Sequence, residues 1–94
     1  MRRIERSSAF KRDYKREAKG KHGATLDEVL GPVLTVLATD RPLAARYRDH
    51  GLSSGWVGYR GCHVKPDLLL IYRVIDLSQV GYPYLQIGAA GIAQ

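Results

Sequence analysis

Residues 47–73 combine groups that transfer protons with groups that carry a fixed positive charge. This segment contains the only tryptophan, the only cysteine and two of the three histidines of the chain. Its candidates for proton transfer are His50, His63 and Asp67, which alternate with cations along the sequence. The cations are Arg48, Arg60, Lys65 and Arg73. Alternation of acid–base groups with fixed cations suits a substrate that carries phosphate.

Two chemistries that these residue types suggest match the spacing poorly. A metal site needs three or four ligands, whereas His50 and His63 lie thirteen residues apart with one carboxylate nearby, so we expect no metal and no cofactor. Hydrolysis by serine or cysteine needs a nucleophile on a recognisable turn, which the sequence around Cys62 lacks. An alternative without catalysis also stays open, in which each histidine is a core or loop residue satisfied by a hydrogen bond.

Metal-free cleavage of RNA uses every class of group in the segment. The ribose 2'-hydroxyl attacks the adjacent phosphate, one group takes its proton, another protonates the departing 5'-oxygen, and cations stabilise the charged phosphorane. Imidazole suits both transfers because its ordinary pKa of about 6.5 lies near neutrality. In such a site His50 or His63 would act as the acid, and Asp67 would act as the base or would orient an imidazole.

The overall charge of the chain is strongly positive. Fifteen Lys and Arg residues against nine Asp and Glu residues give a formal charge of +6, and the pI is near 9.8. This balance favours a polyanionic partner such as nucleic acid, or an acidic protein that covers the basic face. A solvated basic surface without a partner is the alternative.

Length and composition indicate one small domain over residues 1–94, because 45% hydrophobic content suffices for a single core. A lone cysteine, Cys62, allows no internal disulfide, which is consistent with a reducing compartment. The longest apolar stretch, residues 68–72, is far shorter than the roughly 20 residues of a transmembrane helix. We therefore expect a cytoplasmic protein that does not interact with membranes.

The N-terminal half has the pattern of a short strand and two helices. After a strand over residues 2–6, Ser7 or Ser8 is expected to cap a basic helix over residues 9–19. The glycine-rich turn that follows should leave His22 facing solvent.

Thr25 and Glu28 have the spacing of a capping box at the start of a second, apolar helix. Within that helix Gly31-Pro32 predicts a kink, or a break and restart, because proline removes a backbone hydrogen bond.

The C-terminal half has the pattern of strands. The expected strands are residues 55–59, 61–64, 68–75 and 82–87. Residues 68–75 have the strongest pattern and should form the central strand, whereas Pro83 indicates an edge position or a strand start. Short connections favour an antiparallel meander with both helices on one face. The expected fold class is α+β, with two N-terminal helices packed on a small, mainly antiparallel sheet of four to five strands.

The segment from Asp49 to Val74 matches DHxLxxxWxGYRxxHVxPDxLLIYRV, and in this it resembles the YafQ group of RelE-superfamily type II toxins. The motif covers about a quarter of the chain, and the order of the flanking elements extends the similarity over the whole sequence. The resemblance implies a RelE-like microbial RNase fold and a ribosome-dependent endoribonuclease that cuts mRNA in the A site. It also implies an antitoxin that resembles DinJ or RelB and is acidic and partly disordered. This antitoxin would form a heterotetramer with the toxin, in which only the antitoxin contacts operator DNA.

The same resemblance implies roles for individual residues. The family's catalytic histidines and acid fall on His50, His63 and Asp67, and its tryptophan falls on Trp56. Trp56 is a candidate RNA-stacking residue, although a strand tryptophan is more often part of a core. The RNA-binding residues that we expect are Arg48, Trp56, Arg60, Lys65 and Arg73.

The C-terminus departs from the family pattern. Relatives end in a T-G-T/S-H-x-x-L-F-like segment whose histidine is a principal catalytic group. Matching its glycine to Gly88 places Ala90 at the histidine and Gln94 at the phenylalanine. The resemblance therefore leaves two hypotheses: an mRNA interferase whose activity is impaired at Ala90, or a toxin-fold protein that acts only by antitoxin binding and co-repression.

Overall fold

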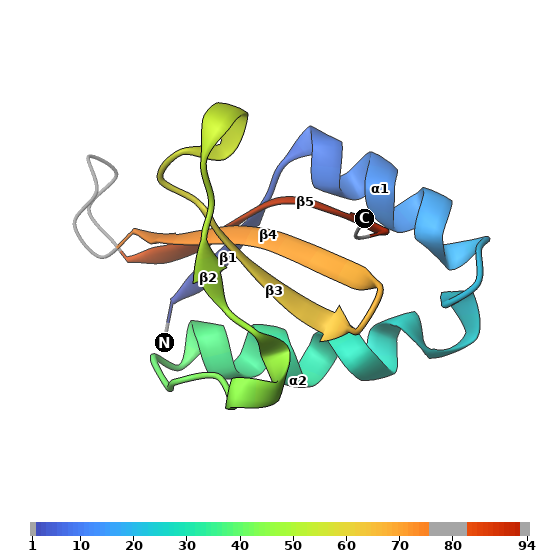
Figure 1. The fold of residues 1–94 in the computed structure, drawn as a ribbon, viewed down its shortest axis with the longest axis horizontal. Coiled ribbons are helices and arrows are strands. Elements are labelled where there is room, and N and C mark those ends of the chain that lie inside the picture. Colours follow the sequence, from blue (N-terminus) through green and yellow to red (C-terminus); the bar gives the residue numbers. More distant parts are fainter. Residues whose placement is uncertain (1, 76–82, 93–94) are drawn as a thin grey trace.

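The structure, a computed structural model, describes residues 2–75 and 83–92, and its elements surround one mixed sheet (Figure 1). The strands are β1 (Arg3–Arg6), β2 (His50–Gly51), β3 (Arg60–Lys65), β4 (Leu68–Ile75) and β5 (Tyr84–Ile92). The helices are α1 (Ser8–Ala18) and α2 (Leu26–Ala38), and the short 3-10 helices are η1 (Gly23–Thr25), η2 (Ala45–Tyr47) and η3 (Ser54–Trp56). Neither α1 nor α2 is long and apolar enough to span a membrane.

Strand β4 lies at the centre of the sheet, whose order is β1-β5-β4-β3-β2. Its residues 68–75 coincide with the strand expected from the sequence. All neighbouring pairs are antiparallel except β1 and β5, which run parallel. The expected α+β class with a mainly antiparallel sheet is therefore confirmed.

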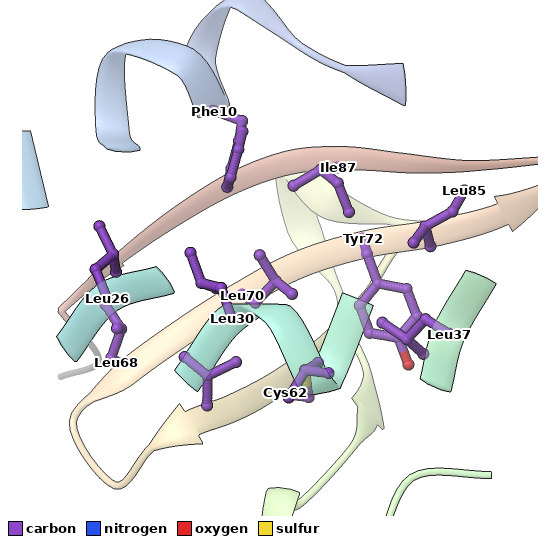
Figure 2. Close-up of a cluster of buried hydrophobic side chains, with 12 residues drawn as sticks. Phe10, Leu26, Leu30, Leu37, Cys62, Leu68, Leu70, Tyr72, Leu85 and Ile87 are labelled. Atoms are coloured by element: carbon purple, nitrogen blue, oxygen red, sulfur yellow. The ribbon is translucent and has the colours of Figure 1, made fainter. Parts of the chain in front are cut away.

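One face of the sheet carries the hydrophobic core. Leu68, Leu70 and Tyr72 alternate along β4 and are at most 2% exposed. In Figure 2 the core side chains of β3, β4 and β5 point toward α2, and Phe10 of α1 lies beside Ile87. Because strand side chains alternate between faces, the residues between these buried positions lie on the opposite, open face.

Helix α1 begins where the sequence indicated. The Ser7 hydroxyl accepts a hydrogen bond from the Phe10 amide at 2.9 Å, which satisfies one free donor at the helix start. The same hydroxyl donates to the Gly88 carbonyl at 2.6 Å, so the helix start is tied to β5.

The structure contradicts the expected side-chain cap of α2 and the expected break within the helix. Thr25 precedes the helix but makes no side-chain cap, because it is already part of η1. The helix also continues through Gly31 and Pro32 without a break. Both residues are exposed, so water can reach the carbonyl that proline leaves without a partner, while the buried apolar face of α2 stabilises the helix.

The expected strand over residues 55–59 is also wrong, because this segment forms η3 and a turn. Ser54 and Gly58 have positive φ angles of 58° and 90°, which are incompatible with an extended strand. Pro83 marks a strand start, since β5 begins at the next residue and is paired on both sides. Tyr82 lies outside the described residues.

Candidate active site

The pairing of β2 with β3 brings His50 and His63 together. His50 lies opposite Gly61, and His63 follows two residues later on the same face of β3. Their ring centroids are 6.1 Å apart, with 27° between the ring planes. Sequence reasoning identified both residues, and the structure places them side by side on the open face.

Hydrogen bonds indicate the tautomer of each ring. His50 Nδ1 lies 2.7 Å from the Arg48 carbonyl oxygen, and His63 Nδ1 lies 3.2 Å from the Pro66 carbonyl oxygen. A carbonyl oxygen only accepts, so each Nδ1 carries the donated proton and each Nε2 is left available. Each Nε2 can therefore accept a proton when its own ring is neutral, or donate one when its own ring is charged.

A basic groove adjoins His63 at the edge of β3. The groove encloses about 530 Å³ between β3, η2 and the N-terminal half of α2. Its cationic lining residues are Arg46, Arg48 and Lys65, with Glu28 on the opposite wall. Arg48 adopts a left-handed conformation with φ 51° and ψ 43°, which turns the chain between η2 and β2. The groove thus places positive charge beside an imidazole, as phosphate binding requires.

Arg60 forms an ion pair with Asp49, and its side chain remains 50% exposed. Its Nη2 lies 3.0 Å from Asp49 Oδ2, and its Nε lies 3.1 Å from the same oxygen. The Tyr72 hydroxyl donates to Asp49 Oδ1 at 2.5 Å. The hydrogen bond with Asp49 raises the pKa of Arg60, and burial followed by Asp49 raises the pKa of Tyr72. This cluster holds the chain just before His50 against β3 and β4.

Trp56, Tyr59 and Arg73 form an aromatic–cation cluster. The Trp56 and Tyr59 rings are 5.1 Å apart at 79°, and Arg73 Cζ lies 4.8 Å from the centroid of Tyr59. A Cβ at Gly88 would lie 3.0 Å from Tyr59 and 3.1 Å from Trp56, so glycine lets both rings approach β5. Gln86 accepts a hydrogen bond from Arg73 Nε at 2.7 Å. Trp56 is half-buried in this cluster and is not a member of the main core.

Among the described residues, Asp67 makes its hydrogen bonds with neither His50 nor His63. Its Oδ1 lies 2.8 Å from His22 Nε2, and its Oδ2 accepts from Lys21 Nζ at 2.9 Å. The hydrogen bond from Lys21, followed by that from His22, lowers the pKa of Asp67. A carboxylate that is ionised and already satisfied by two donors is a weak proton acceptor.

The expectation that His22 faces solvent is wrong, because His22 is only 8% exposed. Gly23 explains this placement: a Cβ there would lie 2.1 Å from the Ala18 carbonyl oxygen. The connection between α1 and α2 therefore packs closely against the end of α1 and turns His22 inward. The signal in the sequence was a histidine that directly precedes a glycine in a tight turn.

The register of β5 does not support Ala90 as the place of a catalytic histidine. Ala90 is paired with the fully buried Leu70 and packs against the core. Its amide donates to Asp13 Oδ2 at 3.1 Å, and its carbonyl accepts from Arg16 at 3.2 Å. A histidine at this position would face the core. Matching the family's glycine to Gly91 instead places the histidine at Ala93, which lies outside the described residues.

Two other chemistries find no support in the described ranges. Burial raises the pKa of the Cys62 thiol to about 12, so it is a poor nucleophile. In residues 2–75 and 83–92, no three His, Cys, Asp or Glu residues lie close enough together to hold a metal ion.

Known proteins resemble the chain in both sequence and fold. The family model described as "Bacterial toxin of type II toxin-antitoxin system, YafQ" matches residues 2–88. The mRNA interferase toxin YafQ of Escherichia coli (strain B / BL21-DE3) is 39% identical over 76 residues, which are 81% of this chain and 80% of that protein. YafQ in the Escherichia coli DinJ–YafQ complex aligns with a TM-score of 0.71 and 34% identity, over 98% of this chain and 93% of that one. A metal-bound toxin from Helicobacter pylori aligns with a TM-score of 0.76 and 34% identity, over 98% and 94%.

The contacts of Asp67 predict a pH dependence of stability. Because its pKa is lowered in the folded protein, its contribution is complete above the ordinary value of 3.8 and is lost as the pH falls through the lower folded value. Urea unfolding should show that Asp67→Asn is less stable than the wild type near neutrality and that the difference shrinks on acidification below about pH 4.

Asp40→Asn is the matched control for this measurement, because it removes a carboxylate that is 84% exposed from its ion pair with Arg2. This variant should differ little from the wild type at any pH. A difference between the wild type and Asp67→Asn that stays constant with pH would contradict the prediction.

Proposed function

The chain belongs to the YafQ family of type II toxins, and on this premise we propose that it is an mRNA interferase. It acts as a ribosome-dependent endoribonuclease that cleaves mRNA in the ribosomal A site by metal-independent acid–base chemistry. The observation that carries the proposal is the adjacent pair His50 and His63, each with Nδ1 bound to a carbonyl and Nε2 available. Relatives named mRNA interferase toxin support the same activity.

In the proposed mechanism the two imidazoles divide the proton transfers. One neutral Nε2 removes the proton from the ribose 2'-hydroxyl, whose oxygen then forms a bond with the adjacent phosphorus. The other, protonated ring donates its Nε2 proton to the departing 5'-oxygen as the bond between phosphorus and that oxygen breaks. The products are a 2',3'-cyclic phosphate and a 5'-hydroxyl, and no other reactant is required. Asp67 serves neither step as a base, because its carboxylate is held by Lys21 and His22.

Cations beside the imidazoles stabilise the charge that develops on the phosphorane. Arg48 and Lys65 line the groove next to His63, and the structure adds Arg46 to them. Arg60 neutralises Asp49 and thereby holds the strand that carries His50, and its half-exposed side chain stays a candidate for binding RNA. In the proposed enzyme Arg46, Arg48 and Lys65 supply the phosphate contacts beside His63, and Arg60 is a further candidate.

The Trp56–Tyr59–Arg73 cluster supplies a surface for a nucleotide base. Trp56 is half-buried, which leaves part of the indole accessible, and Arg73 lies over the Tyr59 ring. Aromatic faces and guanidinium planes bind unpaired bases by stacking. Because this cluster and the two histidines share the open face, one mRNA strand can contact both.

The partner that neutralises the toxin is an acidic antitoxin, which docks between the two helices. A groove of about 600 Å³ there is lined by Phe10, Tyr14, Leu30 and Leu34, and its charged residues are Arg6, Lys11, Lys15 and one acid, Asp27. The Asp27 carboxylate accepts a hydrogen bond from the Tyr14 hydroxyl. An apolar floor with three cations against one acid fits an amphipathic acidic segment that folds on binding. The complex forms as a heterotetramer and contacts operator DNA only through the antitoxin.

The absence of histidine from β5 favours a second candidate, a toxin fold that binds antitoxin without cleaving RNA. Residues 84–92 offer no imidazole, so His50 and His63 must supply both proton transfers in the enzyme. If they do not suffice, the protein retains ribosome or antitoxin binding and loses cleavage.

Codon-positioned mRNA cleavage in a translating extract distinguishes these candidates. We expect the wild type to cleave, and His50→Ala and His63→Ala each to slow cleavage by about 10²- to 10⁴-fold, the usual range for loss of one acid–base group. Thr35→Ala, on the exposed side of α2, should cleave like the wild type. Intact mRNA on toxin-bound ribosomes would contradict the enzyme and support the binding protein.

Charge reversal tests the antitoxin groove separately. Replacing Lys11 and Lys15 by glutamate should weaken binding of the antitoxin encoded with the toxin by about tenfold, mostly through a slower association rate. Lys19→Glu and Arg12→Glu together make the same charge change outside the groove lining and serve as the control. Equal losses in both double variants would show that net charge alone, and not the groove, determines binding.

A further inference from the structure

We propose that His22 is a positioning residue, which together with Lys21 clamps the turn between β3 and β4 and through it fixes the ring of His63. The effect of the clamp on cleavage rests on the proposed function. The clamp itself rests on contacts of the described residues and can be measured without RNA.

The clamp occupies both oxygens of one carboxylate from one connection. His22 Nε2 lies 2.8 Å from Asp67 Oδ1, and Lys21 Nζ lies 2.9 Å from Oδ2. The side chain of His22 is 9% exposed and that of Lys21 is 73% exposed. His22 is therefore the member of the clamp that is shielded from water. A shielded hydrogen bond is stronger than an exposed one, and loss of its partner costs more stability.

The turn needs an anchor outside the sheet because the strand pairing is irregular at this point. The register between β3 and β4 shifts between His63 and Lys65, so the ladder of paired residues is interrupted beside the proposed catalytic ring. Pro66 adds no amide donor to the turn. Lys21 and His22 of the α1–α2 connection hold the turn from outside the sheet by binding Asp67.

The restraint reaches His63 through one peptide unit. Asp67, which the clamp holds, directly follows Pro66, whose carbonyl oxygen accepts the hydrogen bond of His63 Nδ1 at 3.2 Å. That hydrogen bond keeps the proton on Nδ1 and leaves Nε2 available for proton transfer. Without the clamp the Pro66 carbonyl could move away from His63 Nδ1. The His63 ring would then no longer favour the tautomer with its proton on Nδ1.

His22 is more than a filler of space. Burial of an imidazole is unfavourable unless the ring makes a hydrogen bond. If packing were the only requirement at this position, an apolar side chain would fill the same space without that cost. The close approach at Gly23 places the ring where its Nε2 meets Asp67. The residue type at 22 thus matters for its donor atom as well as for its volume.

The experiment compares His22→Leu, which removes the donor, with His22→Gln, which retains a donor of similar reach. Nitrogen-15 NMR of the histidine side chains reports the tautomer of each ring in the free toxin. We expect the Nδ1–H tautomer of His63 in the wild type and in His22→Gln, and a shift toward the Nε2–H tautomer in His22→Leu and in Asp67→Asn. His50, which is bound to the Arg48 carbonyl, is the internal control and should not change.

Cleavage kinetics provide the second readout. His22→Leu should lower kcat by roughly ten- to hundredfold, as small displacements of catalytic groups do, and should leave KM close to that of the wild type. His22→Gln should restore most of kcat. A wild-type tautomer of His63 and a wild-type kcat in His22→Leu would overturn the proposal.

The remaining outcomes are also decisive. If His22→Leu does not fold, Asp67→Asn, which weakens the same contact at its other end, carries the same tautomer and kcat criteria. If the wild-type toxin does not cleave RNA, the proposed function fails, whereas the tautomer of His63 still decides whether the clamp positions the ring.

Discussion

The pairing of β3 with β4 is the constraint on which both the core and the site depend. Cys62 and Val64 of β3 face the core together with Leu68, Leu70 and Tyr72 of β4. This alternation leaves His63 on the open face, where it meets His50. A slip of one residue in this register would bury the imidazole and expose the core side chains of the strand. The burial of apolar groups therefore also determines which face carries the acid–base groups.

The two carboxylates of the motif organise the site, because their contacts hold the segments that carry His50 and His63. Asp49 binds Arg60 and Tyr72, which holds β2 and its histidine against the sheet. Asp67 binds Lys21 and His22, which holds the turn whose carbonyl orients His63. His50 thus directly follows the anchored Asp49, and His63 lies shortly before the anchored Asp67. Asp67, which the sequence indicates as a catalytic candidate, and Asp49 are both satisfied by cations or by hydrogen-bond donors.

The sequence predicted those parts of the fold that depend on local pattern. Residues 68–75 alternate without interruption, and Ser7 has a side chain that caps α1, so both elements were predicted almost to the residue. The segment around Trp56 was not, because Ser54 and Gly58 adopt positive φ angles that the alternating pattern of the sequence does not indicate. Pro32 likewise interrupts the local pattern of α2 but is tolerated where the helix faces solvent.

The candidate site was predicted in part for the same reason. His50 and His63 belong to one motif and lie on adjacent strands, so their proximity follows from the strand pairing. The contact between His22 and Asp67 joins residues 45 positions apart, and no local pattern indicates it. The orientation of Ala90 depends on the β5 register, which shifts near Gly88 and reverses the face expected from simple alternation. Long-range register and packing therefore account for the parts that sequence reasoning missed.

A structure of the toxin on a ribosome, with mRNA that carries a 2'-deoxy nucleotide at the cleavage position, tests the two-histidine mechanism most directly. We expect the scissile phosphate between His50 and His63, with each Nε2 within hydrogen-bond reach of about 3 Å from an mRNA oxygen. The neighbouring base should contact Trp56. A scissile phosphate bound elsewhere, with neither imidazole in reach, would contradict the mechanism.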